Sequence, residues 1–125
     1  MKFYTFFLGL ALTSTGLAQS ATNLALNDTP TPIASSVIYE VNVRQFSKEG
    51  TFVEVQKALP RLKAMGVDIL WLMPINPIGL KNRKGSLGSY YAVRDYKGIN
   101  PEFGTLSDFK NLVNSAHNQG MRLII

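Results

Sequence analysis

An almost unbroken apolar run at residues 67–73 (VDILWLM) most constrains how this 125-residue chain can fold. The run has the length of a strand and is apolar on both of its faces. Such a pattern is typical of a strand in a parallel sheet that helices cover. We therefore expect helices on both sides of this segment along the chain.

Two amphipathic helices are predicted. The first follows Thr51, which we expect to form a capping box with Glu54, and it ends at Gly66. The second begins after the cap Thr105 and ends at Gly120. Apolar side chains recur at helical spacing in both, at Phe52, Val55, Leu59 and Leu62 in the first and at Leu106, Phe109, Val113 and Ala116 in the second.

Two further strands complete the pattern. Residues 37–44 (VIYEVNVR) alternate between an apolar and a polar face, and residues 121–125 (MRLII) are apolar. The order strand, helix, strand, long loop (residues 74–104), helix, strand predicts two successive βαβ units of a parallel sheet. A strand with a polar face favours a barrel, and neither of the first two strands is followed by a dinucleotide fingerprint or a P-loop. The predicted fold class is therefore α/β, the first three strands and two helices of a truncated (β/α)8 TIM barrel, since a whole barrel needs about 250 residues.

The first twenty residues differ from the rest of the chain. Lys2 precedes a nearly continuous apolar stretch at residues 3–12, and small and polar residues follow it. This layout predicts a signal peptide over residues 1–20 and a secreted or periplasmic protein. The alternative is a membrane anchor, which needs about 20 apolar residues, so no membrane span is expected. Residues 21–36 are predicted to be a flexible lead-in, and residues 37–125 to be the domain.

Composition excludes several kinds of site. The absence of cysteine excludes disulfides, thiolate metal sites and a cysteine nucleophile. The net charge of the chain is +5, and three of its basic residues lie close together in one loop, at Lys81, Arg83 and Lys84. No aromatic interleaving or basic helix face accompanies them, so we interpret them as a solvated loop and expect no nucleic-acid partner. His117, the one histidine, has no second ligand candidate nearby, and no metal role is predicted for it.

Three stretches resemble the α-amylase family of glycoside hydrolases. They are residues 37–46 (VIYEVNVRQF), 66–75 (GVDILWLMPI) and 91–109 (YAVRDYKGINPEFGTLSDF). They match, in order and spacing, the first strand, the second strand and the following loop of that family's catalytic barrel. The third stretch is the most specific, with the positions Tyr91, Asp95, Tyr96, Asn100, Pro101, Phe103, Gly104 and Thr105.

The resemblance implies a retaining hydrolase or transglycosylase whose partner is an α-glucan or malto-oligosaccharide substrate. The family's catalytic Asp, Glu and second Asp follow its fourth, fifth and seventh strands, so we expect no catalytic residue in this chain and no activity from it alone. An Asp, Asn and His motif after the third strand serves calcium and the substrate in the family. The resemblance therefore implies calcium only for the complete enzyme, with no cofactor or metal in this chain. Two rivals stay open, a non-catalytic carbohydrate-binding or interaction protein on the same barrel and a different parallel α/β enzyme.

The resemblance also assigns roles to single residues. Tyr91 matches the aromatic that stacks under the sugar at the cleavage point, where its ring meets the apolar CH face of glucose. Packing on the barrel rim is the alternative for it. Asp95 and Tyr96 are expected to structure the loop near the site, Asp95 through backbone N–H groups. Many members that release single sugars from small oligosaccharides carry an Asp where this chain has Gly88, so that exo-type specificity is not implied.

Four other side chains are assigned structural roles. Glu40 and Arg44 lie four residues apart on the polar face of the first strand, and we expect them in a polar network because a buried carboxylate is usually paired. Tyr90 is expected to pack beside the rim. Trp71 is predicted to lie in the core.

Overall fold

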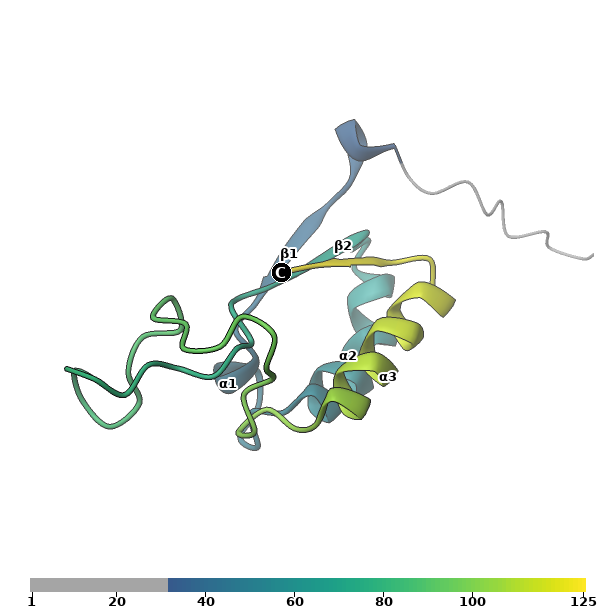
Figure 1. Cartoon of the computed structure of the whole chain (residues 1–125). Coiled ribbons are helices and arrows are strands. Elements are labelled where there is room, and N and C mark those ends of the chain that lie inside the picture. The colour runs from purple at the N-terminus through teal and green to yellow at the C-terminus, as the bar shows by residue number, and fades with distance from the viewer. Residues whose placement is uncertain (1–31) are drawn as a thin grey trace, which may run out of the picture.

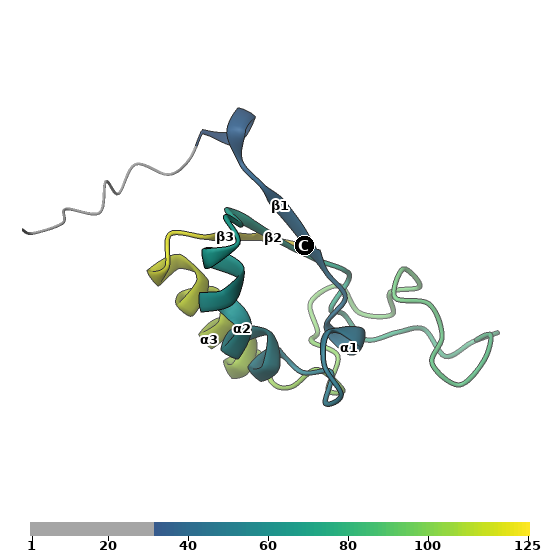
Figure 2. The ribbon, with the colours of Figure 1, turned by 180° about the vertical axis from the view of Figure 1, so that it is seen from behind.

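A three-stranded parallel sheet with two helices on one side forms the body of the protein (Figures 1 and 2). The computed structural model describes residues 32–125, so the predicted signal peptide and most of the lead-in lie outside the described residues. The strands are β1 (Ile38–Val41), β2 (Ile69–Leu72) and β3 (Arg122–Ile124), in the order β1-β2-β3. Both neighbouring pairs are parallel, which confirms the two βαβ units. A short 3-10 turn, η1 (Ile33–Ser35), precedes the sheet.

Helix α2 (Phe52–Ala64) connects β1 to β2. Its predicted stripe is fully buried, and Gly66 adopts the left-handed φ of +87° just after the helix. The predicted capping box is wrong, because Thr51 makes no side-chain hydrogen bond to the helix. The Glu54 carboxylate pairs instead with Lys57, at 2.6 Å between Oε1 and Nζ.

Helix α3 (Leu106–Asn118) leads into β3, and its start is a complete capping box. The Thr105 N–H donates to Asp108 Oδ2 at 2.8 Å, and the Asp108 N–H donates to Thr105 Oγ1 at 3.2 Å. Leu112 and Ala116 form the buried face. The predicted stripe is wrong at Leu106, which is 54% exposed. Leu106 lies about 120° around the helix from Leu112, at the margin of the face that packs.

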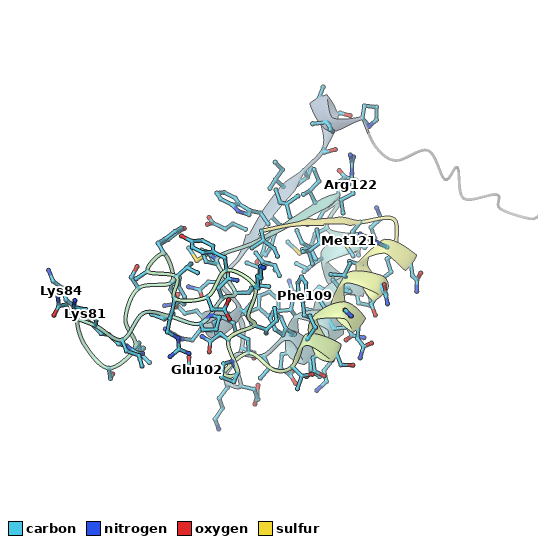
Figure 3. The ribbon with its side chains drawn as sticks, viewed as in Figure 1. Lys81, Lys84, Glu102, Phe109, Met121 and Arg122 are labelled. Carbon is cyan, nitrogen blue, oxygen red and sulfur yellow. The ribbon has the colours of Figure 1, made fainter. Side chains whose placement is uncertain are left out.

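Three phenylalanines tie the two helices to the end of the long loop. The Phe52 ring meets Phe103 edge-on at 6.0 Å between centroids and lies 5.5 Å from Phe109. The Phe52 N–H also donates to the Phe103 carbonyl at 2.9 Å, so the loop supplies a partner for one free N–H at the start of α2. Figure 3 shows Phe109 directed inward from α3.

The first strand is shorter than the alternation predicted. β1 ends at Val41, and Val43 and Arg44 belong to the short helix α1 (Val43–Phe46). Val41 and Val43 are both buried, 1% and 2% exposed. A helical turn buries Val43 as well as a continuing strand would, so the apolar pattern does not distinguish the two. The turn starts where the Gln45 N–H donates to the Asn42 carbonyl at 3.0 Å.

Trp71 is not in the core, contrary to the prediction. It is 42% exposed, whereas its neighbours Leu70 and Leu72 are fully buried beneath the helices. Successive residues of a strand point to opposite faces, so Trp71 lies on the other face, in register with Glu40 and Ile124. No described element covers that face of the sheet. Within residues 32–125, no helix has the length and apolar character needed to cross a membrane.

Candidate functional site

The long loop over residues 74–104 and helix α1 both lie beyond the carboxyl ends of the strands (Figure 1). In barrels of parallel strands, the carboxyl ends form the face that carries the active site. Tyr91, which is predicted to contact the substrate, lies on this loop together with Asp95 and Tyr96, which are expected to structure it. The candidate site is therefore the face where α1 and the loop meet.

Arg44 of α1 joins two parts of the loop. Its Nη2 donates to Glu102 Oε2 at 2.7 Å, and its guanidinium carbon lies 4.7 Å from the centre of the Tyr90 ring. Asn42 Nδ2 donates to the Tyr90 hydroxyl at 3.2 Å. These four residues, which we call the Arg44 cluster, hold Tyr90 by its ring face and by its hydroxyl. Tyr90 is half-buried, in agreement with the predicted packing role.

The expected polar network therefore contains Arg44 but not Glu40. The Glu40 side chain is exposed on β1, and no hydrogen bond or ion pair joins it to another described residue. The premise of a buried carboxylate was wrong for this position. Because Arg44 lies on α1 rather than on the strand, its side chain reaches Glu102 of the loop.

Tyr91 and Tyr96 present exposed rings on the same loop. Tyr91 is 65% exposed and Tyr96 82% exposed. The Tyr91 N–H donates to Ser89 Oγ at 3.3 Å, while its ring stacks on no other aromatic ring of the described chain. The Tyr91 ring is thus free to meet a ligand, whereas the ring of Tyr90 is already packed.

Asp95 and Tyr96 make local contacts that order the loop. Asp95 Oδ1 accepts the N–H of Lys97 at 2.9 Å. The Tyr96 carbonyl accepts a hydrogen bond from Asn76 Nδ2 at 3.1 Å, and the same amide donates to the Gly98 carbonyl at 3.0 Å. The contact of Asp95 with a backbone N–H is the type that its predicted role requires. Asn76 was not singled out by the sequence analysis, and its position just after the second apolar run is the one signal that points to it.

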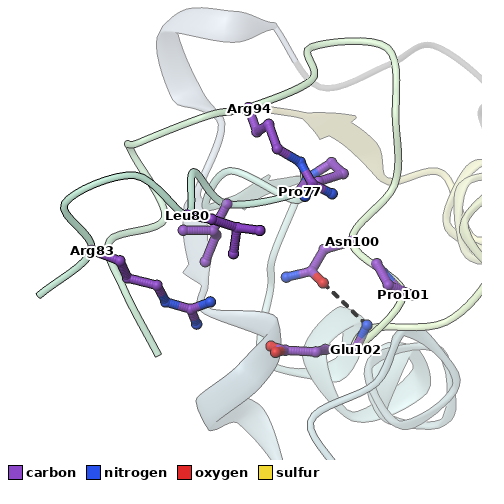
Figure 4. A pocket seen from close by; sticks show the side chains of 8 residues that line it. Pro77, Leu80, Arg83, Arg94, Asn100, Pro101 and Glu102 are labelled. Atoms are coloured by element: carbon purple, nitrogen blue, oxygen red, sulfur yellow. Dashed lines mark hydrogen bonds between the residues drawn. The ribbon is translucent and has the colours of Figure 1, made fainter. Parts of the chain in front are cut away.

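A small open cavity lies within the loop (Figure 4). Its volume is about 140 Å³. The Asn100 Oδ1 at its edge accepts the N–H of Glu102 at 3.1 Å, which orders the wall near the Arg44 cluster. The lining residues are Pro77, Ile78, Leu80, Arg83, Arg94, Asn100, Pro101 and Glu102. The sequence analysis did not predict this cavity, because its two walls are separated along the chain.

The described residues do not assemble a metal centre. No group of three or more His, Asp or Glu side chains lies close enough within residues 32–125 to hold a metal ion. His117 is exposed on α3. The resemblance implied calcium only for the complete enzyme, and that expectation stays a prediction.

Parallel strands alternating with helices, and a loop with exposed aromatics at the carboxyl ends of the strands, are features of a (β/α)8 enzyme domain. The chain belongs to the α-amylase family, since the family of α-amylase catalytic domains matches residues 21–125. The family and the partial-barrel fold predicted from the sequence are thereby confirmed.

Solved structures agree with this assignment. The chain is 58% identical to an α-amylase from Lactobacillus plantarum, with a TM-score of 0.69 over 70% of this chain and 21% of that one. It is 45% identical to the maltogenic α-amylase AmyB from Thermotoga neapolitana, with a TM-score of 0.68 and the same coverage.

A curated relative of the chain is a maltosyltransferase. The α-1,4-glucan:maltose-1-phosphate maltosyltransferase of Rhodospirillum rubrum is 38% identical over 85% of this chain and 18% of that protein. The chain therefore spans about a fifth of the length of the relatives it matches.

Proposed function

We propose that this chain is the first part of the catalytic barrel of a retaining glycosidase that acts on α-linked glucans. The observation that carries the proposal is the match to the α-amylase catalytic domain over residues 21–125. The similar α-amylases of known structure support a glucan substrate for the complete enzyme.

Tyr91 is proposed to be the platform for a glucose ring. Its exposed ring lies on the loop at the carboxyl face, and the CH face of a sugar packs on an aromatic ring at low cost in conformational entropy. The Arg44 cluster holds the preceding residue, Tyr90, and so limits the positions that the Tyr91 backbone can take. Positioning a substrate in this way contributes to the rate because the reacting groups start close to their reactive geometry.

The chemistry itself is assigned to residues outside this chain. Hydrolysis with retention of the anomeric configuration needs two carboxyl groups about 5–5.5 Å apart, one as nucleophile and one as acid/base. Glu40, Asp95 and Glu102 are the acids nearest the proposed face by position, and none of them matches a catalytic position of the family. We therefore place both carboxylates on later strands of the complete enzyme.

Glycosyl transfer is the second candidate, because the maltosyltransferase and a trehalose synthase from Pimelobacter are both similar to the chain. The similarity to the Lactobacillus α-amylase, at 58% identity over 70% of this chain, favours hydrolysis.

The test uses the complete protein that carries this chain, incubated with soluble starch and with maltotetraose. Hydrolysis with retention releases new reducing ends, and proton NMR detects the α-anomer before mutarotation. Transfer instead produces longer oligosaccharides without a rise in reducing ends. Starch binding without turnover would support the non-catalytic rival, and a β-anomer as first product would contradict the retaining mechanism.

A further inference from the structure

We propose that Arg44 is a positioning residue for the reaction, which holds the turn that carries Tyr91 and thereby raises kcat rather than the affinity for substrate. This role rests on the proposed function, since it requires Tyr91 to be the platform for a glucose ring. Arg44 itself touches no substrate in this role. It acts through Tyr90, the residue before the platform.

The Arg44 side chain is held on three sides. Its Nη2 lies 2.7 Å from Glu102 Oε2, and its guanidinium carbon lies 4.7 Å from the centre of the Tyr90 ring and 5.8 Å from that of Phe103. The side chain is 15% exposed. A cation over an aromatic face is attracted to it more strongly when water is largely excluded. Arg44 therefore holds Tyr90 against the end of the long loop.

The backbone of Arg44 is fixed by the close approach of Gly50. A Cβ added at Gly50 would lie 2.8 Å from the Arg44 carbonyl oxygen and 3.2 Å from its Cα. The φ of Gly50 is +62°, a conformation that glycine adopts readily. The segment after α1 thus packs directly on the backbone of Arg44, and it fixes the helical turn from which the side chain extends.

Tyr90 and Tyr91 are coupled because they are the central pair of one turn. The Ala92 N–H donates to the Ser89 carbonyl at 3.0 Å and closes that turn. A closed turn of four residues restricts the backbone dihedral angles of both central residues together. A side chain that holds Tyr90 therefore also limits the directions in which the Tyr91 ring can project.

The two ends of this turn are anchored in different ways. Beyond Tyr91, the Ala92 carbonyl accepts the Gly79 N–H at 2.6 Å, a backbone contact that no side-chain substitution removes. Before Tyr91, the anchor is the ring of Tyr90 under the Arg44 guanidinium. The direction of the Tyr91 ring thus depends on one side-chain contact that mutation can remove.

Loss of the Arg44 charge is expected to separate kcat from KM. The Tyr91 ring would remain and a sugar could still pack on it, so KM should change little. The ring would take a wider range of positions, so a smaller fraction of the bound sugar would lie in the reactive geometry, and kcat should fall.

The test is steady-state consumption of maltotetraose by the complete enzyme, with Arg44→Met, Tyr91→Ala and the double variant. Arg44→Met is expected to lower kcat on the order of fivefold, with KM within about twofold. In the Tyr91→Ala background it should change kcat/KM by less than about twofold, because the ring that it positions is gone. Arg44→Lys keeps the cation, and it loses no hydrogen bond at Nε, which has no acceptor within residues 32–125. It should retain at least about half of kcat.

Arg61→Met is the matched control, because it removes the same charge from the last turn of α2, away from the loop. It should leave kcat within about twofold of the unaltered enzyme. Thermal melts verify the fold, and Glu102→Gln provides a second variant at an exposed position. It removes the ion pair with Arg44 and should lower kcat about two- to threefold.

Two results would overturn the role of Arg44 alone. One is an equal loss of kcat/KM from Arg44→Met with and without the Tyr91 ring, and the other is a raised KM with unchanged kcat. Full activity of Tyr91→Ala would instead overturn the sugar platform, and the role of Arg44 together with it.

Discussion

Tyr90 and Tyr91 show how far two adjacent residues of one type can differ. The ring of Tyr90 lies under the Arg44 guanidinium, while Tyr91 is 65% exposed. The two residues are the central pair of a turn that the hydrogen bond from the Ala92 N–H to the Ser89 carbonyl closes at 3.0 Å, and within this turn one ring packs while its neighbour faces solvent. The chemistry of the two side chains is identical, and their surroundings decide which can meet a sugar.

Replacing Tyr91 tests its role as a platform. In the complete enzyme, Tyr91→Ala is expected to lower kcat/KM for a malto-oligosaccharide about tenfold, because it removes the ring face that the sugar contacts. Tyr91→Phe keeps the ring and should retain most of the activity. Steady-state kinetics of the two variants measure this.

Tyr96→Ala serves as the matched control for that experiment. Tyr96 is 82% exposed on the same loop, and the hydrogen bond that it accepts from Asn76 uses its backbone carbonyl, which the substitution leaves in place. It should leave kcat/KM within about twofold of the unaltered enzyme. Equal activity of Tyr91→Ala and Tyr91→Phe would return Tyr91 to a packing role.

At the scale of elements, the two helices start in different ways although both follow a threonine. Thr105 and Asp108 form a capping box, whereas Thr51 does not cap α2. Glu54 could have completed a capping box at the start of α2, but its carboxylate pairs with Lys57 instead. The sequence motif supplies the groups, and the competition between partners decides whether the cap forms.

The capping box makes α3 sensitive to acid. The hydrogen bond from the Thr105 hydroxyl, followed by that from the Thr105 N–H, lowers the pKa of Asp108 below its ordinary value of 3.8. A lowered pKa in the folded state means that this stabilisation is present above that value and is lost as the pH falls through the folded pKa. Asp108→Asn should therefore reduce the loss of melting temperature between about pH 5 and about pH 2.

Thr105→Ala should flatten the same acid dependence, since it removes the hydroxyl that stabilises the carboxylate. At neutral pH it should also lower the free energy of unfolding by about 1 kcal/mol, the usual cost of losing a cap. Thermal melts of the complete protein across the pH series measure both effects. An acid dependence unchanged in both variants would show that Asp108 does not titrate in this way.

Phe52 is the residue on which both helices and the loop depend. It is 0% exposed and contacts the rings of Phe103 and Phe109. Phe52→Ala should lower the free energy of unfolding by about 3–5 kcal/mol, because it leaves a cavity at that junction. Val53→Ala, at an adjacent position of α2 that is 41% exposed, should change it by less than about 0.5 kcal/mol. Urea denaturation of the two variants compares them, and equal losses would contradict this account of the core.

At the scale of the whole molecule, one face of the sheet and its edges have no cover within the described residues. Ile38, Trp71 and Ile124 are 55%, 42% and 46% exposed on the sheet. Apolar strands exposed in this way, with unpaired backbone at the edges, associate readily with other chains. The face that a barrel would enclose is the face left open here.

Residues 21–125 expressed alone are therefore expected to be insoluble or only partly folded, and to hydrolyse neither a chromogenic α-glucoside nor soluble starch. Three strands cannot close a barrel, and no acid of the segment matches a catalytic position of the family. Long incubations with both substrates and circular dichroism melts test the two statements. A cooperative melt together with turnover that Glu40→Gln abolishes would contradict them.

The predicted signal peptide is also open to a direct test. Expression of the complete gene in a bacterium should give an exported product that is cleaved near Ala18 or Ser20, because residues 1–20 have the layout of a signal peptide. N-terminal sequencing of the exported protein measures this. An intact Met1 on that product would show that the segment is not removed.

The sequence by itself determined the order of the three strands and of helices α2 and α3. Apolar residues at helical spacing predicted α2, the unbroken apolar run predicted β2, and Gly66 and Gly120 marked the helix ends. These features depend on contacts within a few residues, which a local pattern records.

Only the tertiary structure decided which residues far apart in the sequence contact one another. The pairing of Arg44 with Glu102 joins residues 58 positions apart, and nothing in the alternation of residues 37–44 indicated that Arg44 would leave the strand on a helical turn. Trp71 fits a core strand by its pattern, yet it faces the side of the sheet that no described helix covers. The cavity with Arg83 and Arg94 likewise exists because the loop folds back on itself. Such contacts depend on the path of the chain through space, and a periodicity of two or of 3.6 residues carries no record of that path.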